Sequence, residues 1–144
     1  MAEVGIECGC RTCSGKLQDP PFAAGSFQFA SAFNVLDCVA SPLGFLESVA
    51  GMLPSGGRAV LATPYDWSTN VTPMEAWIGG HSQRGPTGGA AEPFLRTLLT
   101  AGAHPQSSAR LRITGEIENV QWQARLHDRS NVAYSVHLVA TEAV

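Results

Sequence analysis

An uninterrupted apolar run over residues 59–62 stands out in the pattern of hydrophobic and polar positions. A run of this length without polar alternation predicts a strand that is covered on both faces. The preceding turn, residues 54–57, holds two adjacent glycines, which adopt backbone conformations that strain other residues. After Thr63 the chain changes to a polar and aromatic cluster at residues 65–67. Because open α/β sheets place ligands at the ends of such strands, we expect a functional site there.

A strand and a helix are predicted ahead of that run, the strand over residues 26–34 and the helix over residues 41–53. Phenylalanines and alanines dominate the first segment and indicate a buried strand. Ser41, followed by proline, is typical of a helix N-terminus with serine as the N-cap. The apolar face of the helix consists of Leu43, Leu46, Val49, Ala50 and Leu53. Strand, helix and strand in this order predict two parallel strands joined by a right-handed crossover.

The spacing of hydrophobic residues changes twice in the remainder of the chain. Residues 64–90 contain glycines, prolines and tryptophans without a sustained period, which predicts a long loop that packs on the domain and is functional. Residues 92–99 open with an acid and a proline, as a helix does. Alternation of period two over residues 111–127 and 132–140 predicts an antiparallel pair joined by residues 128–131. The predicted fold class is therefore α/β, with two parallel strands, a crossover helix, a second helix and a terminal antiparallel pair.

Composition limits the possible partners and location. The 144 residues are 44% hydrophobic, which is enough to bury the core of one domain. A formal net charge of -3 and a pI near 5.7 leave no basic excess for a phosphate backbone, so we expect no nucleic-acid partner. The sequence has no N-terminal leader pattern and no apolar run near the ~20 residues that span a bilayer. We therefore expect a cytoplasmic protein without membrane association.

Residues 1–25 show no countable helical or strand period, so we expect an irregular N-terminal segment ahead of a domain at residues 26–144. Cys8, Cys10 and Cys13 offer three thiolates to zinc, but a structural site needs four ligands at matched spacing. A disulfide is disfavoured in a reducing compartment. The sequence therefore predicts free thiols and no metal site.

The order of the elements resembles the C-terminal half of class I S-adenosylmethionine-dependent methyltransferases. The likeness lies in residues 21–27, 34–37 and 53–61. In that family the first segment enters strand four, the second ends that strand beside the cofactor, and the third forms the turn into strand five. The resemblance covers about residues 20–141 and implies the C-terminal half of a Rossmann-like sheet.

The loop after the apolar run carries a more distinctive likeness. Residues 63–67 read TPYDW and residues 72–80 read TPMEAWIGG. They are similar to a branch of small-molecule methyltransferases that includes the methyltransferase part of ovothiol-forming enzymes. The family's glycine-rich turn after strand one has no counterpart in this sequence. The resemblance implies S-adenosylmethionine as cofactor, a small-molecule acceptor, and a chain that is truncated as a methyltransferase.

The resemblance also assigns roles to particular residues. It makes Asn34, Leu36 and Asp37 cofactor-binding residues and places Asn34 and Asp37 beside the amino-acid end of the cofactor. Polar capping of a strand-helix junction is an alternative explanation for Asn34 and Asp37. The resemblance makes residues 64–90 a substrate wall and lid. The candidate substrate-binding residues are Tyr65, Trp67, Trp77 and Arg84, and the candidate bases are Asp66 and His81. The alternative is that the tryptophans are packing anchors and the charges are solvated. The remaining histidines, His137 among them, are predicted to be structural or exposed.

Two functions stay open at this point. One is a small-molecule methyltransferase whose cofactor-binding half lies outside this sequence. The other is a non-catalytic truncated or interaction module, which another chain or self-association completes. The strand at residues 26–34 favours the second, because in the full fold it pairs with strand one and here it would offer an open apolar edge.

Overall fold

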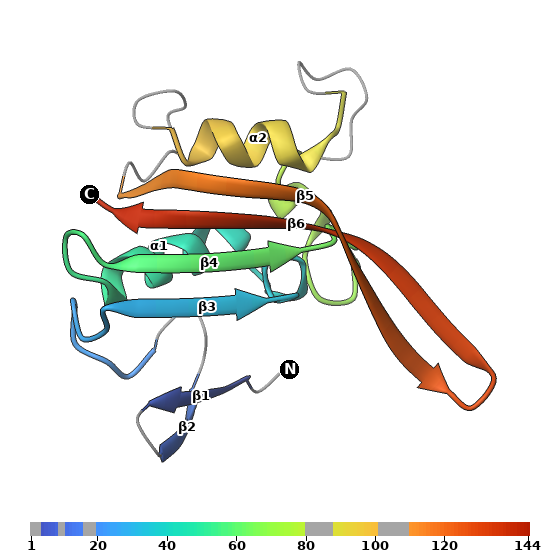
Figure 1. The fold of residues 1–144 in the computed structure, drawn as a ribbon, viewed down its shortest axis with the longest axis horizontal. Helices are drawn as coiled ribbons and strands as arrows, with labels where there is room; N and C mark the ends of the chain where they lie inside the picture. Colours follow the sequence, from blue (N-terminus) through green and yellow to red (C-terminus); the bar gives the residue numbers. More distant parts are fainter. Residues whose placement is uncertain (1–3, 9–10, 16–19, 80–87, 101–109) are drawn as a thin grey trace.

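The computed structural model describes residues 4–8, 11–15, 20–79, 88–100 and 110–144. Its main feature is a four-stranded sheet in the order β3-β4-β6-β5, formed by β3 (Phe29–Phe33), β4 (Arg58–Thr63), β5 (Leu111–His127) and β6 (Ser130–Ala143). The helices are α1 (Pro42–Met52) and α2 (Ala91–Leu98), with short 3-10 turns η1 (Leu36–Cys38) and η2 (Met74–Ala76). Figure 1 shows α1 behind the sheet and α2 beside β5. The predicted α/β class is confirmed.

The strand-helix-strand unit has the predicted form. β3 and β4 pair in parallel, with Ala30 opposite Ala59 and Ala32 opposite Leu61. Ser41 is the N-cap of α1, and its hydroxyl accepts a hydrogen bond from the Gly44 amide at 3.1 Å. This bond satisfies one of the amide groups that a helix N-terminus leaves without an intrahelical partner.

The glycine turn before β4 requires both of its glycines. Gly56 has φ +80°, which lies in the left-handed region. At Gly57 a Cβ atom would lie 2.9 Å from the Pro54 carbonyl oxygen. The turn also extends the pairing of β4 with β6, because the Gly56 amide donates to the Ala143 carbonyl at 2.8 Å. Substitution of either glycine would therefore disturb the entry to β4.

The terminal strands form the predicted antiparallel pair, but the turn between them is tighter than expected. His127 pairs with Ser130, so only residues 128 and 129 form the turn. The register of the pair shifts at three places. Figure 1 shows the outer half of this hairpin extending away from the four-stranded part of the sheet.

One hydrophobic core joins both helices to a single face of the sheet. Leu46 and Val49 of α1, Leu95 and Leu98 of α2, and Val139 of β6 belong to the same buried cluster. Leu95 and Val139 have no measurable exposure. The crossover helix and the second helix thus cover the same face.

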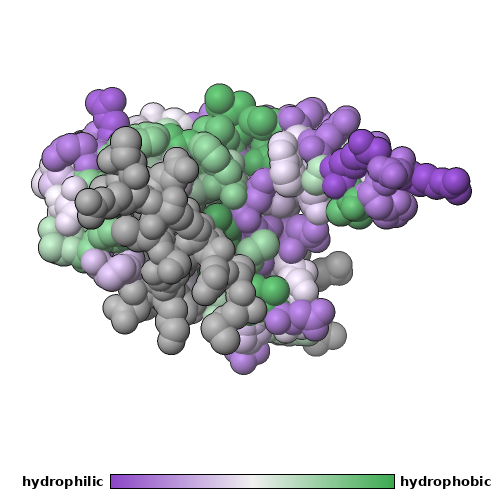
Figure 2. All heavy atoms as spheres, turned by 90° about the horizontal axis from the view of Figure 1, so that it is seen from below, coloured by the Kyte–Doolittle hydropathy of each residue, from purple (hydrophilic) through white to green (hydrophobic). Residues whose placement is uncertain are grey.

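The expectation that residues 26–34 form a buried strand is wrong for one face of β3. Phe29 and Phe33 are each 58% exposed, whereas Ala30 and Ala32 pack against the core. β3 ends the strand order and no described helix lies on the face that carries its phenylalanines. Figure 2, which views the molecule from below, shows hydrophobic side chains gathered at the upper margin.

Residues 1–25 are also more regular than expected. β1 (Val4–Cys8) and β2 (Arg11–Gly15) form an antiparallel hairpin with Ile6 opposite Cys13. Backbone pairing defines such a hairpin, so the apolar alternation used to predict strands is not needed. Cys10 lies outside the described residues. Among the residues described, no group of three potential metal ligands occurs and no helix is long and apolar enough to cross a membrane.

Substitution Ser41→Ala tests the predicted cap. Loss of the hydroxyl leaves the Gly44 amide without its side-chain acceptor, so the free energy of unfolding should fall by about 1 kcal/mol. Urea unfolding followed by circular dichroism measures the change. Ser31→Ala, at an exposed position of β3, is the control and should leave the midpoint nearly unchanged. Equal midpoints for both variants would show that the cap contributes nothing.

Candidate functional site

The candidate site lies where the parallel strands β3 and β4 end. Asn34 follows β3 with φ +55°, and its amide donates to the Ala62 carbonyl at 2.7 Å. Asn34 is one of the residue types that tolerate this left-handed conformation. Because both strands run in the same direction, η1 and the loop after β4 meet at the same edge of the sheet. This edge is where open α/β sheets bind ligands.

Asp37 is the centre of this edge. It is 2% exposed, and its Oδ2 accepts a hydrogen bond from the Asp66 amide at 2.7 Å. Its Oδ1 and the Oδ1 of Asn34 are buried without a hydrogen-bond partner in the described part of the chain. Buried oxygens normally have a donor, so two unpaired acceptors at one strand edge indicate a place for the donors of a ligand.

The surroundings of Asp37 favour its protonated form. Burial raises the pKa of the carboxyl above its usual range. The Asp66 amide opposes this shift by donating to the charged form, and the Asp66 carboxylate adds a smaller upward shift. Burial and the Asp37 charge raise the pKa of the neighbouring Cys38 thiol, which is free and exposed. At Asp37, burial is therefore opposed by hydrogen bonds to the carboxyl, and the bond from the Asp66 amide has the largest effect among them.

The loop after β4 is held against this edge by Thr72. Its hydroxyl lies 2.7 Å from the Val39 carbonyl and 3.2 Å from the Asp37 carbonyl. The Thr72 carbonyl in turn accepts from Trp77 Nε1 at 3.0 Å. Thr72 has no measurable exposure. Sequence reasoning missed this residue, since a threonine inside an aperiodic loop gives no signal of the carbonyls it will meet.

Two tryptophans form an aromatic wall beside the same edge. The rings of Trp67 and Trp77 stack with centroids 6.2 Å apart and an interplanar angle of 17°. Tyr65 lies next to them, with its ring centroid 6.5 Å from that of Trp67. Both tryptophans are half-buried, so they pack on one another and still present surface to solvent. This packing agrees with the prediction that the loop is not disordered.

Tyr65 connects the loop to β6. Its backbone has φ +56°, and its amide donates to Thr63 Oγ1 at 3.1 Å. Its hydroxyl lies 2.8 Å from Nδ1 of His137, which is 4% exposed. His137 is thus buried and not exposed. The alternation in β6 could not show this, because His137 stands in the more polar set of alternating positions, with Ser135 and Thr141.

The β5–β6 hairpin also reaches the site. Desolvation makes the largest contribution to the raised pKa of the Tyr134 hydroxyl. The negative charge of Asp66 and a hydrogen bond to Asp66 raise this pKa further. Tyr134 stacks on Trp122 with ring centroids 5.3 Å apart. Asp66 itself is exposed, with its carboxylate near this tyrosine. The sequence did not indicate Tyr134 as a site residue, because the contact depends on the twist of the long hairpin.

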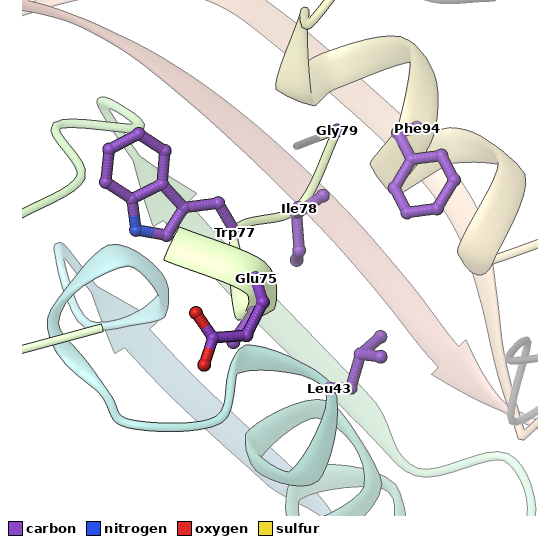
Figure 3. Close-up of a pocket in the computed structure, with 7 residues that line it drawn as sticks. Leu43, Glu75, Trp77, Ile78, Gly79 and Phe94 are labelled. Carbon is purple, nitrogen blue, oxygen red and sulfur yellow. The ribbon is translucent and has the colours of Figure 1, made fainter. Parts of the chain in front are cut away.

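A pocket of about 290 Å³ lies beyond Trp77, between α1, η2 and α2. It is lined by Leu43, Glu75, Ala76, Trp77, Ile78, Gly79 and Phe94. Figure 3 shows Leu43, Ile78 and Phe94 entering it from three different segments, whereas Trp77 points away toward the strand ends. Trp77 therefore lies between the pocket and the edge that carries Asp37.

Most of the candidate residues meet at one edge. Asn34, Asp37, Tyr65, Asp66, Trp67 and Trp77 are gathered by β3, β4 and the following loop. Leu36 is 2% exposed and its side chain belongs to the core, which leaves only its backbone for a ligand. His81 and Arg84 lie outside the described residues.

Comparisons with known proteins support the fold alone. No protein-family model matches this sequence. No curated protein matches it either. Among solved structures, it resembles an enzyme associated with the conversion of a disulfide bond into a thioacetal group during echinomycin biosynthesis, at 10% identity and a TM-score of 0.58. The match covers 90% of this chain and 54% of the other, so the chain spans about half the length of that structure. The chain thus has a partial Rossmann-like fold, which resembles about half of that structure.

The substitution Asp37→Asn tests the charge balance at the site. A carboxyl with a raised folded pKa binds its proton more tightly when folded, so its stabilising contribution is present below its unfolded pKa of about 4. That contribution is lost as the pH rises through the folded pKa. The difference in unfolding free energy between the wild type and Asp37→Asn should therefore change with pH above this value, as urea unfolding at a series of pH values would reveal.

Asp128→Asn is the matched control, because the Asp128 side chain is 95% exposed. Its unfolding free energy should follow the wild type across the series. Parallel curves for wild type and Asp37→Asn would contradict the raised pKa.

Proposed function

We propose that this chain is the substrate-side part of an S-adenosylmethionine-dependent methyltransferase that acts on a small molecule. The observation that carries the proposal is the pair of buried oxygens, Asn34 Oδ1 and Asp37 Oδ1, which have no hydrogen-bond partner among the described residues and which both follow β3, beside the end of the parallel strand β4. The methyltransferase-like fold of the structural neighbour and the resemblance of the loop sequence support the choice of reaction.

The hydrogen-bond acceptors at this edge fit one end of such a cofactor. An amino-acid moiety carries an ammonium group with several donors, and carboxylate and amide oxygens are suitable acceptors for it. Asn34 and Asp37 would hold that group. One oxygen of Asp37, Oδ2, is already fixed by the hydrogen bond from the Asp66 amide. S-adenosylmethionine supplies an activated methyl group when bound. The chain's own residues would then contribute proximity and orientation.

The acceptor would lie against the loop. Trp67 and Trp77 offer an aromatic wall, and Tyr65 joins this wall to the sheet. Asp66 is the candidate base, because it is exposed beside the wall and carries a carboxylate that takes a proton from an attacking group. His81 and Arg84 keep their proposed roles as second base and substrate ligand.

Binding of the cofactor by this chain alone should be weak. The glycine-rich turn that binds the rest of the cofactor in the family has no counterpart in the sequence. We propose that a second chain or segment supplies it, so the described residues bind mainly one end of the molecule.

Calorimetric titration with S-adenosylhomocysteine tests this function. Weak binding to the wild type is expected, and Asn34→Ala and Asp37→Ala should each weaken it by about fivefold or more through the loss of a buried acceptor. Asp128→Ala, with its exposed carboxylate at the hairpin turn, is the control and should bind like the wild type. Tight binding by this chain alone would disprove the weak-binding argument, and binding unaffected by both site variants would disprove the site.

A non-catalytic interaction module is the second candidate, and the open face of the sheet favours it. Phe33, Ala62, Leu138 and Ile117 are successive register partners across all four strands. The outer two, Phe33 and Ile117, are each 58% exposed. An apolar row that no described helix covers, next to a strand edge that no described strand pairs with, favours association. The occupant we propose is a second copy of this chain.

Sedimentation velocity at several concentrations tests this self-association. The double substitution Phe29→Lys/Phe33→Lys places two charges on β3 and should shift the distribution toward monomer. Leu126→Lys is the control, because Leu126 is 62% exposed on the outer hairpin and away from β3. A monomeric wild type at every concentration would exclude this candidate.

A further inference from the structure

A continuous chain of hydrogen bonds runs from the surface of α2 to the candidate site. Arg96 Nε lies 2.9 Å from Glu116 Oε1, and the same oxygen lies 3.1 Å from His137 Nε2. The other ring nitrogen, Nδ1, lies 2.8 Å from the Tyr65 hydroxyl. The chain thus connects α2, β5 and β6 to the first residues of the loop after β4.

The chemistry of the four groups fixes the direction of these bonds. A carboxylate only accepts hydrogen bonds, so His137 Nε2 donates to Glu116. With that proton on Nε2, Nδ1 accepts from the Tyr65 hydroxyl, whose pKa is raised by burial, with the Glu92 and Glu116 charges adding to the shift. Arg96 pairs with Glu116 and Glu118 and so holds the Glu116 carboxylate beside the imidazole.

Tyr65 is adjacent in sequence to the amide that binds Asp37. A tyrosine with φ +56° is in a strained backbone conformation, which persists only where surrounding contacts hold it. The contacts are the Thr63 hydroxyl at the Tyr65 amide and His137 at the Tyr65 hydroxyl. The next amide along the chain, that of Asp66, lies 2.7 Å from Asp37 Oδ2.

We propose that Tyr65, His137 and Glu116 are positioning residues that hold the Asp66 amide on the Asp37 carboxylate and so control whether Asp37 is ionised. The proposal rests on the proposed function for what an ionised Asp37 does, which is to bind a donor group of the ligand. The positioning itself can be tested without a ligand. None of the three residues was indicated for this role by the sequence.

The other groups around Asp37 would be unchanged when this chain is broken. They are the Asp66 carboxylate, the Cys38 thiol and the Tyr134 hydroxyl, which itself responds to the Asp37 charge. Loss of the Asp66 amide would therefore remove the main opposition to burial and leave Asp37 protonated to higher pH.

A carbon-detected NMR titration of the Asp37 carboxyl tests the proposal in the full chain. In Tyr65→Phe the midpoint should move to higher pH, with a roughly tenfold decrease in the acid dissociation constant, because a hydrogen bond to a charged group is lost. Glu116→Gln should move it in the same direction by less. Its side chain is 27% exposed, so this variant should fold even where Tyr65→Phe does not.

Two substitutions of His137 separate positioning from general stability. Asn presents an oxygen near the place of Nδ1 and keeps an acceptor for Tyr65, whereas Gln reaches toward the place of Nε2 and does not. His137→Asn should therefore titrate nearer to the wild type than His137→Gln. Thr141→Val is the control, since it removes a buried hydroxyl from the same strand at a distance from Asp37 in the sequence, and should leave the midpoint unchanged.

An unchanged Asp37 midpoint in folded Tyr65→Phe and Glu116→Gln would overturn the proposal. An equal shift in Thr141→Val would also overturn it, by showing that general loosening of the structure is enough. Affinity for S-adenosylhomocysteine, measured in parallel, separates the two claims: a shifted midpoint without any binding in the wild type supports the positioning and contradicts the proposed function.

Discussion

The hydrogen bond from the Asp66 amide to the Asp37 carboxylate joins two segments that are 29 residues apart in the sequence. One segment ends β3 and the other ends β4, so the bond is possible only because the two strands are parallel and stop at the same edge. This bond fixes Oδ2 of Asp37, whereas Oδ1 has no partner among the described residues. The arrangement of Thr72, Trp77 and Tyr65 around this edge serves to keep the loop where the bond can form.

The same architecture leaves the sheet unequal on its two faces. Both described helices pack into one core with Leu95 and Val139, while Phe29 and Phe33 stay exposed on the opposite face. The covered face supports the strand ends that carry the site. The exposed face is available for association, either with another copy or with a chain that completes the sheet. A site at the strand ends and an apolar face on the sheet are therefore compatible in one molecule.

Much of the fold could be predicted from the sequence, because local signals agreed with tertiary packing. Ser41 before a proline, the glycine pair before β4 and the alternation in β5 each act within a few residues. The exposure of Phe33 could not be predicted, since apolar composition does not say which face a helix covers. The buried position of His137 was equally hidden, because His137 belongs to the more polar set of alternating positions in β6. For the site, a strand end could predict Asp37 and Asp66 as candidates, but the link through Tyr65 required the three-dimensional structure.

The most direct test of the account is to follow the amide resonances of the isotope-labelled chain during addition of S-adenosylhomocysteine. A ligand at the strand ends should cause the largest changes at the side-chain amide of Asn34 and at the backbone amide of Asp66, which donates to Asp37. Changes confined to the exposed face of β3, or to the pocket beside Phe94, would contradict a ligand site at the ends of the parallel strands.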